Sequence, residues 1–264
     1  MSMKVLRSIW IAAEFIVAAL GITDQAQSQT FNANNPAASG YKLVFQDNFQ
    51  SFDVKKWSYG WAWSGGSGSN GDSYPNDEGL PGNITFGKNG AQLAVKKQRT
   101  PSGQPYATSV MTTWGKFAQT YGYWEASVQM PKKANGIWPA FWLVPTDFSW
   151  PPEIDILEWL GKEPKSLFMT SHYAANDLHG GGTYTGQDFS AAFHRVGVLW
   201  TKTSITWYID GIQRAKSTIG VPSKPMYIIL NNDTGGWDKN VVDSTTVFPV
   251  NFSVAYVAVY KSPN

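Results

Sequence analysis

The sequence contains no cysteine, few charged residues and, after its first segment, no long apolar run. Without cysteine the chain forms no disulfide, so its stability has to come from a hydrophobic core. Charged residues make up 15% of the 264 residues, and the net charge is +2. A field that weak gives no basis for binding DNA, RNA or an acidic membrane surface. No segment beyond the first approaches the ~20 apolar residues that span a bilayer.

Aromatic residues are as frequent as charged ones, at 15%, and 13 of them are tryptophan. This composition differs from that of a disordered chain, which is poor in aromatic residues and rich in charge. The length suits one large all-β domain or two small ones, with enough residues for one substantial core. So many aromatic side chains have to be buried in that core or used to bind something.

The first segment has the layout of an export signal. Lys4 and Arg7 precede an apolar stretch over residues 9–22, and small and polar residues follow at 26–28. A charged start, an apolar centre and a small-residue cleavage site are the parts of a secretory signal peptide. Glu14 inside the stretch weakens insertion into the bilayer, so we interpret the segment as a signal peptide rather than a helical anchor.

On this interpretation the chain has three parts. Residues 1–28 are the signal peptide, residues 29–39 form a polar linker, and residues 40–264 form one folded domain. The linker shows neither helical nor strand period. The mature protein would then be secreted, either extracellular or periplasmic, and would touch no membrane after signal removal.

From residue 41 the chain is a succession of short β-rich runs separated by Gly, Pro, Asn and Asp. No run carries a sustained helical period, and no internal repeat is visible. Many short strands with turn signals between them predict a β-sandwich or barrel, and we expect one sandwich domain. The runs cover residues 41–45, 91–97, 121–130, 139–144, 153–159, 167–173, 196–200, 204–210, 226–230 and 252–260.

Two loops stand out between these runs. Asp210 and Gly211 lie between two β-rich runs and form a strong signal for a two-residue hairpin turn. The glycine-rich segment 60–79 also holds Trp61, Trp63 and Tyr74. It is too irregular for a strand and too aromatic for a simple linker, so we interpret it as a binding loop.

The run over residues 150–159 is the most informative in the sequence. In a strand, Glu153 and Asp155 share one face, while Ile154 and Ile156 point to the other. A regular strand would then bury Glu158 in the core, and an unpaired buried carboxylate costs several kcal/mol. One extra residue, accommodated as a β-bulge near 156–157, returns Glu158 to the acidic face.

Three carboxyls on one face repel one another, which raises the pKa of at least one and leaves another ionised. A glycosidase needs this division of labour. One glutamic acid protonates the leaving oxygen, and the other attacks the anomeric carbon or activates water, depending on the distance between the two carboxyls. The spacing alone does not decide between these two mechanisms.

The simplest alternative is a solvated strand face with acids outside and isoleucines inside. The neighbouring residues Trp138, Trp142, Trp150 and Trp159 favour the functional interpretation. Sugars present flat C–H faces that stack on aromatic rings, and binding pockets combine apolar walls with few polar groups. About half of all the tryptophans are nevertheless expected in the core.

At this segment the sequence resembles glycoside hydrolase family 16, which includes laminarinases, lichenases, agarases, carrageenases and bacterial exopolysaccharide-depolymerising glycanases. Residues 153–158 read as the family's bulged signature, acid-x-Asp-x-x-Glu. Further matching motifs follow in family order at 43–49, 121–131, 136–145, 194–200, 205–211 and 254–260.

The resemblance implies a concanavalin-A-like jelly-roll sandwich of two antiparallel sheets with a concave substrate cleft. It also implies retention of anomeric configuration, with Glu153 as nucleophile, Glu158 as acid/base and Asp155 as their electrostatic neighbour.

By the same analogy, Trp138 and His172 are expected at the cleft, and Trp142, Asn83 and Trp237 are further expected substrate-binding residues. Taken alone, a histidine such as His172 is more often structural. The expected partner is a β-linked polysaccharide, no cofactor is expected, and the protein is expected to be a monomer.

The sequence departs from the family pattern at three positions. Val110 stands where many laminarinases have arginine, so a strict laminarin preference is not expected. The segment 138–161 is similar instead to bacterial enzymes that cut mixed-linkage or acidic exopolysaccharides. Asn48 and Ala255 replace two acids of the family's calcium site, so no metal is expected.

The predicted function is therefore a retaining endo-β-glycanase acting on β-1,3 or mixed β-1,3-1,4 glucan. One alternative is a depolymerase of another β-linked polymer, such as an acidic exopolysaccharide or a galactan. A second is a non-catalytic lectin-like module, because fold does not fix function. A third is a transglycosylase, which passes the same covalent intermediate to a sugar.

Overall fold

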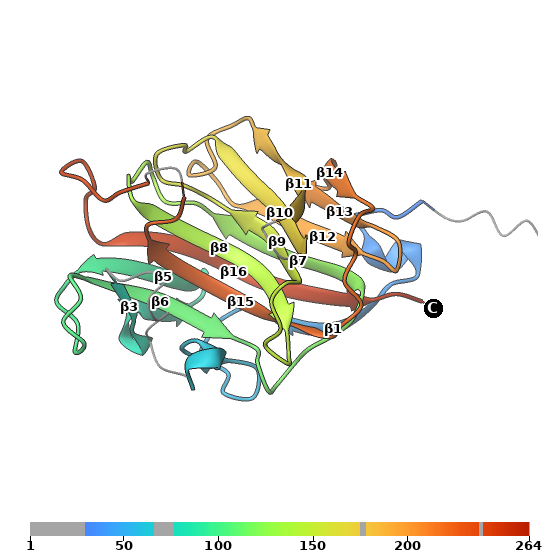
Figure 1. The fold of residues 1–264 in the computed structure, drawn as a ribbon, viewed down its shortest axis with the longest axis horizontal. Coiled ribbons are helices and arrows are strands. Elements are labelled where there is room, and N and C mark those ends of the chain that lie inside the picture. Colours follow the sequence, from blue (N-terminus) through green and yellow to red (C-terminus); the bar gives the residue numbers. More distant parts are fainter. Residues whose placement is uncertain (1–29, 66–76, 175–177, 238–239, 264) are drawn as a thin grey trace, which may run out of the picture. The chain divides into compact units, whose positions relative to one another are not determined.

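The computed structural model describes residues 30–65, 77–174, 178–237 and 240–263 (Figure 1). The chain divides into two compact units, Met1–Thr30 and Phe31–Asn264. The first lies almost entirely outside the described residues, so the signal peptide over 1–28 stays a prediction. The second carries all the secondary structure of the described residues. Within them, no helix is long and apolar enough to cross a membrane.

The second unit is almost entirely β-structure. Its short 3-10 helices are η1 (Pro36–Ser39), η2 (Ala62–Ser64) and η4 (Pro81–Asn83). Its strands are β1 (Lys42–Asp47), β2 (Ser58–Tyr59), β3 (Asp77–Gly79), β4 (Ile84–Gly87), β5 (Gly90–Lys97), β6 (Tyr106–Thr112), β7 (Gly122–Gln129), β8 (Ile137–Pro145), β9 (Glu153–Glu158), β10 (Ser166–Ala174), β11 (Leu178–Thr185), β12 (His194–Trp200), β13 (Ile205–Ile209), β14 (Ile212–Ser217), β15 (Met226–Thr234) and β16 (Val250–Lys261).

The strands form two antiparallel sheets. The first sheet has the order β11-β10-β9-β8-β15-β6, with β2 on the far side of β6. The second has the order β4-β5-β16-β7-β12-β13-β14, with β1 also paired to β16. A short pairing of β5 with β6 joins the sheets, and β3 pairs with β6 in parallel. The predicted all-β sandwich is confirmed.

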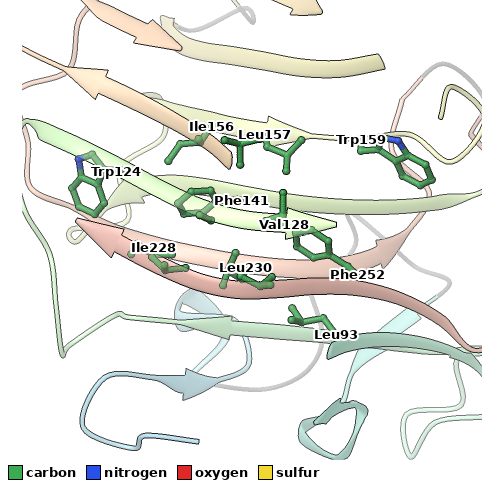
Figure 2. Close-up of a cluster of buried hydrophobic side chains, with 14 of the residues drawn as sticks. Leu93, Trp124, Val128, Phe141, Ile156, Leu157, Trp159, Ile228, Leu230 and Phe252 are labelled. Atoms are coloured by element: carbon green, nitrogen blue, oxygen red, sulfur yellow. The ribbon is translucent and has the colours of Figure 1, made fainter. Parts of the chain in front are cut away.

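The core lies between the two sheets. Figure 2 shows side chains of both sheets there, among them Leu93 and Phe252 of the second sheet and Phe141 and Leu230 of the first. All four are fully buried. Burying a large apolar side chain stabilises a fold by about 1.5–3 kcal/mol. In a chain without disulfides, this core is the main source of stability.

Residues ahead of the expected domain boundary pack on the sandwich. The ring of Phe31 packs against three tyrosine rings. Its centroid lies 5.0, 4.9 and 5.8 Å from the ring centroids of Tyr41, Tyr123 and Tyr208. Ala33 is also buried. The compact unit therefore begins at Phe31, and an aromatic contact fixes the segment ahead of residue 40, which contains η1 but no strand.

The turn between β13 and β14 is the predicted two-residue hairpin. Asp210 and Gly211 have φ angles of 53° and 77°, and Ile209 pairs with Ile212 on either side. Two residues with positive φ define a type I′ turn, which an Asp-Gly pair favours. A Cβ on Gly211 would meet the exposed Asn34 side chain, so the positive φ, rather than lack of space, favours glycine here.

Candidate active site

The catalytic strand expected from the sequence, β9, carries the predicted bulge. On β8, neighbouring residues pair with Leu157 and Asp155, which leaves Ile156 as the extra residue of β9. The ladder with β10 skips the same position. Ile154 and Ile156 are both buried in the core. The bulge therefore brings Glu158 onto the cleft face without exposing either isoleucine.

A side chain from the opposite sheet supports this bulge. Trp207 on β13 is fully buried, and its indole Nε1 donates a hydrogen bond of 2.8 Å to the backbone oxygen of Asp155. Because a bulge disrupts the regular ladder, a donor from outside the sheet helps to satisfy its backbone. Trp207 thus holds the backbone between the two glutamates from the core side of the sheet.

Replacing Trp207 with phenylalanine is expected to lower both stability and turnover. A buried acceptor left without its donor costs about 1–3 kcal/mol. Trp200→Phe is the matched control, because Trp200 is equally buried in the second sheet and donates to Pro222 O at 3.0 Å. We expect similar falls in melting temperature for both variants, but a fall in kcat only for Trp207→Phe. Equal kcat values would show that Trp207 has no special role at the bulge.

Glu153 and Asp155 form one hydrogen-bonded group with His172. The His172 Nε2 atom lies 3.2 Å from Asp155 Oδ2 and 3.8 Å from Glu153 Oε1. The Trp150 indole donates to Glu153 Oε2 at 3.0 Å. The predicted acidic face is therefore a network in which an imidazole and an indole hold two of the three acids.

Glu158 lies on the same face with a separate partner. Its Oε1 atom accepts a hydrogen bond of 3.1 Å from the Trp138 indole. Burial, and then the charge of Glu153, raise the pKa of Glu158 to about 8, while Trp138 opposes the shift. At neutral pH this carboxyl is therefore protonated, which is the state that a general acid needs.

The pKa values of the other two carboxyls are also raised by burial, but different neighbours lower them. Burial, and then the charge of Glu158, raise the pKa of Asp155 to about 6, and the bond to His172 lowers it. Burial and the charge of Asp155 raise the pKa of Glu153 well above its usual range, and His172 and Trp150 act against this. The hydrogen bond from Trp150 and the charge of the His172 ring act toward the ionised form of Glu153, which a nucleophile requires, against the larger effect of burial.

A cleft of about 1170 Å³ contains all three acids. Four residues predicted to bind substrate, Trp138, Trp142, His172 and Trp237, line it. Two groups of aromatic residues in contact with one another are among its lining residues. One group contains Trp61, Trp63 and Trp142, and the other contains Trp138, Phe168 and Trp237.

The first aromatic group includes part of the predicted binding loop. Trp61 and Trp63 stack on each other at 5.0 Å and both line the cleft. Residues 66–76 of the loop, with Tyr74, lie outside the described residues.

Asn83 is the expected substrate-binding residue that the structure places elsewhere. It is buried, its side-chain amide donates to Thr108 O at 3.2 Å, and it is not among the residues that line the cleft. Its backbone oxygen also accepts from Ser109 Oγ. Asn83 thus anchors the end of η4 to β6, a structural task that a sequence motif does not distinguish from substrate binding.

Two polar residues of the cleft, Asn231 and Asp233 on β15, were not predicted from the sequence. Both are buried and line the cleft beside β8. The run recognised from the sequence ended at residue 230. Extending its alternation would have placed residues 231 and 233 on one face.

The region of the family's calcium site does not fit calcium in this chain. Asn48 and Ala255 line a second cavity of about 500 Å³, and none of the described residues around it is Asp or Glu. Lys88 lies there instead, among amide side chains. Calcium takes 6–8 oxygen ligands, with carboxylates prominent among them. A lysine and amides do not supply such a set.

One other group of possible metal ligands exists among the described residues. Ligand atoms of Glu153, Asp155 and His172 lie within 4.8 Å of one another. These are the side chains of the cleft in which the His172 ring contacts both carboxyls.

A β-sandwich with a tryptophan-lined cleft and paired carboxyls on its floor defines a polysaccharide-cleaving glycosidase. Residues 77–247 match the model of Glycosyl hydrolases family 16, and the chain belongs to that family.

Similar proteins agree with this assignment. The chain is 39% identical over 142 residues to Endo-1,3-1,4-beta-glycanase ExsH of Rhizobium meliloti, covering 51% of this chain and 29% of ExsH. It is 39% identical over 146 residues to Endo-1,3-1,4-beta-glycanase EglC of the same organism, covering 53% and 30%. The chain thus spans about a third of the length of these relatives.

A solved structure covers more of the chain. The laminarinase catalytic domain from Thermotoga maritima superposes with a TM-score of 0.73 at 28% identity, over 85% of this chain and 99% of that domain.

Proposed function

We propose that this chain is a retaining endo-β-glycanase that hydrolyses β-1,3 or mixed β-1,3-1,4 glucan. The observation that carries the proposal is that Glu153 and Glu158 lie on one cleft face, with Glu158 protonated and the Trp150 indole donating a hydrogen bond to Glu153. The relatives named endo-1,3-1,4-beta-glycanase and the laminarinase of similar fold support the substrate class.

The reaction follows from these two states. Glu158 donates its proton to the glycosidic oxygen while a carboxylate oxygen of Glu153 attacks the anomeric carbon. The bond to the leaving sugar breaks, and a glycosyl ester forms on Glu153. Glu158, now ionised, takes a proton from water, whose oxygen displaces Glu153 from the anomeric carbon. Two displacements leave the product with the configuration of the substrate.

The ionisation states of the carboxyls depend on one another during this cycle. Asp155 lies between the two glutamates on β9 and contacts the His172 ring. When the Glu153 charge is consumed by the ester, the pKa of Glu158 falls, because the charge of Glu153 is one cause of its rise. Glu158 is then ready to act as a base for water.

The aromatic groups favour binding within a long chain. Trp61, Trp63 and Trp142 lie together, and Trp138 and Trp237 form a separate pair. Sugar rings stack on such surfaces. Two separate platforms in one cleft offer stacking surfaces for more than one sugar of a chain, which supports an endo-acting enzyme.

Charge favours a neutral polymer over an acidic exopolysaccharide. The described residues lining the cleft include four acids, Glu153, Asp155, Glu158 and Asp233, and neither lysine nor arginine. Recognition of carboxylate or sulfate groups normally uses arginine or lysine. The acidic exopolysaccharide therefore remains the second candidate substrate.

The test is the release of reducing ends from laminarin, barley glucan, lichenan, agar, carrageenan and bacterial succinoglycan. We expect release from one or more of the three glucans, with internal cuts that shorten the polymer early. Binding of a glucan without release would indicate a lectin-like module. Longer products in place of new reducing ends would indicate a transglycosylase.

We also propose that the protein is exported after removal of residues 1–28 and acts as a monomer. The charged start and apolar stretch ahead of residue 29 support export. Mass spectrometry of the secreted protein is expected to show an amino terminus near Gln29. A functional protein that retains Met1 would contradict this.

A further inference from the structure

The cleft contains a fourth acid that the reaction does not use. Asp233 lies on β15, two strands away from the catalytic strand, because β8 lies between them. Neighbouring strands are about 4.8 Å apart, so the β15 backbone is roughly 10 Å from that of β9. Asp233 therefore lines the cleft at a distance from the strand that carries Glu153 and Glu158.

A polar network holds Asp233 in this position. The Asn231 side-chain amide donates to Asp233 Oδ2 at 3.0 Å, and Asn231 Oδ1 accepts from the Trp142 indole at 2.7 Å. Asn232 between them points the other way and donates to Leu93 O and Val250 O in the opposite sheet. The alternation of β15 thus aims Asn231 and Asp233 together at the cleft.

The network also connects Asp233 to the aromatic residues that bind sugar rings. Asp233 pairs in register with Trp138, whose indole contacts Glu158. Trp142, at the other end of the network, packs against Trp61 and Trp63. Asp233 is thus a buried acid in the cleft, and it lies between Trp138, which contacts Glu158, and Trp142.

We propose that Asp233 is a specificity-determining residue that selects uncharged glycans and rejects those with an acidic substituent. The inference rests on the proposed glycanase function and names its substrate class more narrowly. A carboxylate accepts hydrogen bonds from sugar hydroxyls and repels a second carboxylate. No lysine or arginine among the described lining residues compensates for that repulsion.

The test compares one polymer in two forms, barley glucan and the same glucan lightly carboxymethylated. We expect the native protein to have a much higher kcat/KM on the neutral form, and added salt to reduce this preference by screening. Asp233→Asn keeps an acceptor for the Asn231 amide and removes the charge. We expect it to reduce the preference for the neutral form by about tenfold.

Glu163→Gln is the matched control, because Glu163 is exposed, pairs with Lys162 at 3.9 Å and does not line the cleft. It removes the same charge from the protein and should leave the preference unchanged. A native protein without any preference would overturn the proposal, whether or not the Asp233 variant folds. An unchanged preference in a folded Asp233→Asn protein would overturn it as well.

Failure of the proposed function would look different. A native protein that hydrolyses neither polymer would contradict glycan hydrolysis. Affinity electrophoresis through gels that contain each polymer would then test the inference alone. Stronger retardation by the neutral polymer, reduced in Asp233→Asn, is the result expected. Equal retardation of both proteins, or none, would overturn the inference.

Discussion

Glu153→Ala is expected to abolish hydrolysis of glucan, with a fall in kcat of roughly 10⁴-fold or more, because no other group can form the glycosyl ester. The fold and the binding of polymer should persist, since the side chain lines the cleft and contributes little to the core. Reducing-end assays and melting curves measure these outcomes. Glu163→Ala, at an exposed glutamate outside the cleft, is the control.

Azide makes the prediction for Glu153 specific. In Glu153→Ala the small anion enters the space of the lost carboxylate and attacks an activated aryl glycoside directly. One displacement instead of two gives an α-glycosyl azide from a β-linked substrate. Proton NMR of the first product from the native protein is the independent check. An initial α-anomer would mean inversion, and Glu153 would no longer be the nucleophile.

The sequence was sufficient to predict the catalytic strand because a single energetic conflict defined it. A regular strand over 153–158 would have buried Glu158, and a bulge was the least costly way to avoid this. The structure shows the bulge at Ile156, with Ile154 and Ile156 buried and Glu158 on the cleft face. Local alternation and the cost of a buried charge are both readable from a sequence.

Contacts between distant segments could not be predicted in the same way. Trp207 reaches Asp155 O from the opposite sheet, across 52 positions of the chain. Phe31 is held by Tyr123 and Tyr208, so the segment before residue 40 packs on the domain although it has no strand pattern. Such contacts depend on how two sheets stack, which single-strand patterns do not contain.

The same limit applies to the substrate-binding residues. Asn83 was expected to bind substrate, and the structure shows its amide bonded to a backbone oxygen of the neighbouring strand. Asn231 and Asp233 end a strand whose apolar part was recognised, but only the three-dimensional structure shows that their face is the cleft floor. A polar residue near a strand end can be structural or functional. Its contacts in the fold distinguish the two roles, and its sequence pattern does not.

Replacing Glu158 is expected to give the second large loss of activity, and its pH dependence distinguishes it from the loss at Glu153. The pKa of Glu158 is raised to about 8 by burial and by the charge of Glu153. The general acid must be protonated, so native activity should fall as pH rises through about 8. Glu158→Ala is expected to lower kcat on glucan by about 10²–10⁴-fold. On an activated aryl glycoside, which needs little acid assistance, the glycosyl ester should still form at an appreciable rate, and the alkaline fall of that step should disappear.

Azide again identifies the role. With Glu153 intact, the glycosyl ester still forms in Glu158→Ala, and azide then displaces it without needing a base. Two displacements give a β-glycosyl azide, the opposite anomer from the Glu153 variant. A product of the α-configuration, or an alkaline fall that persists in the variant, would contradict the assignment of Glu158 as acid/base.

The raised pKa also predicts how stability depends on pH. A carboxyl whose pKa is higher in the folded state than its ordinary value of 4.5 stabilises the fold at low pH, where it is protonated in both states. This stability is lost as pH rises from about 4.5 to about 8, because ionisation favours the unfolded chain. Glu158→Gln stays neutral throughout. It should therefore melt like the native protein at pH 4 and several degrees higher at pH 9, a difference on the order of a few kcal/mol. A native protein that is the more stable of the two at pH 9 would show that Glu158 is stabilised as a carboxylate, and that it is not the proton donor.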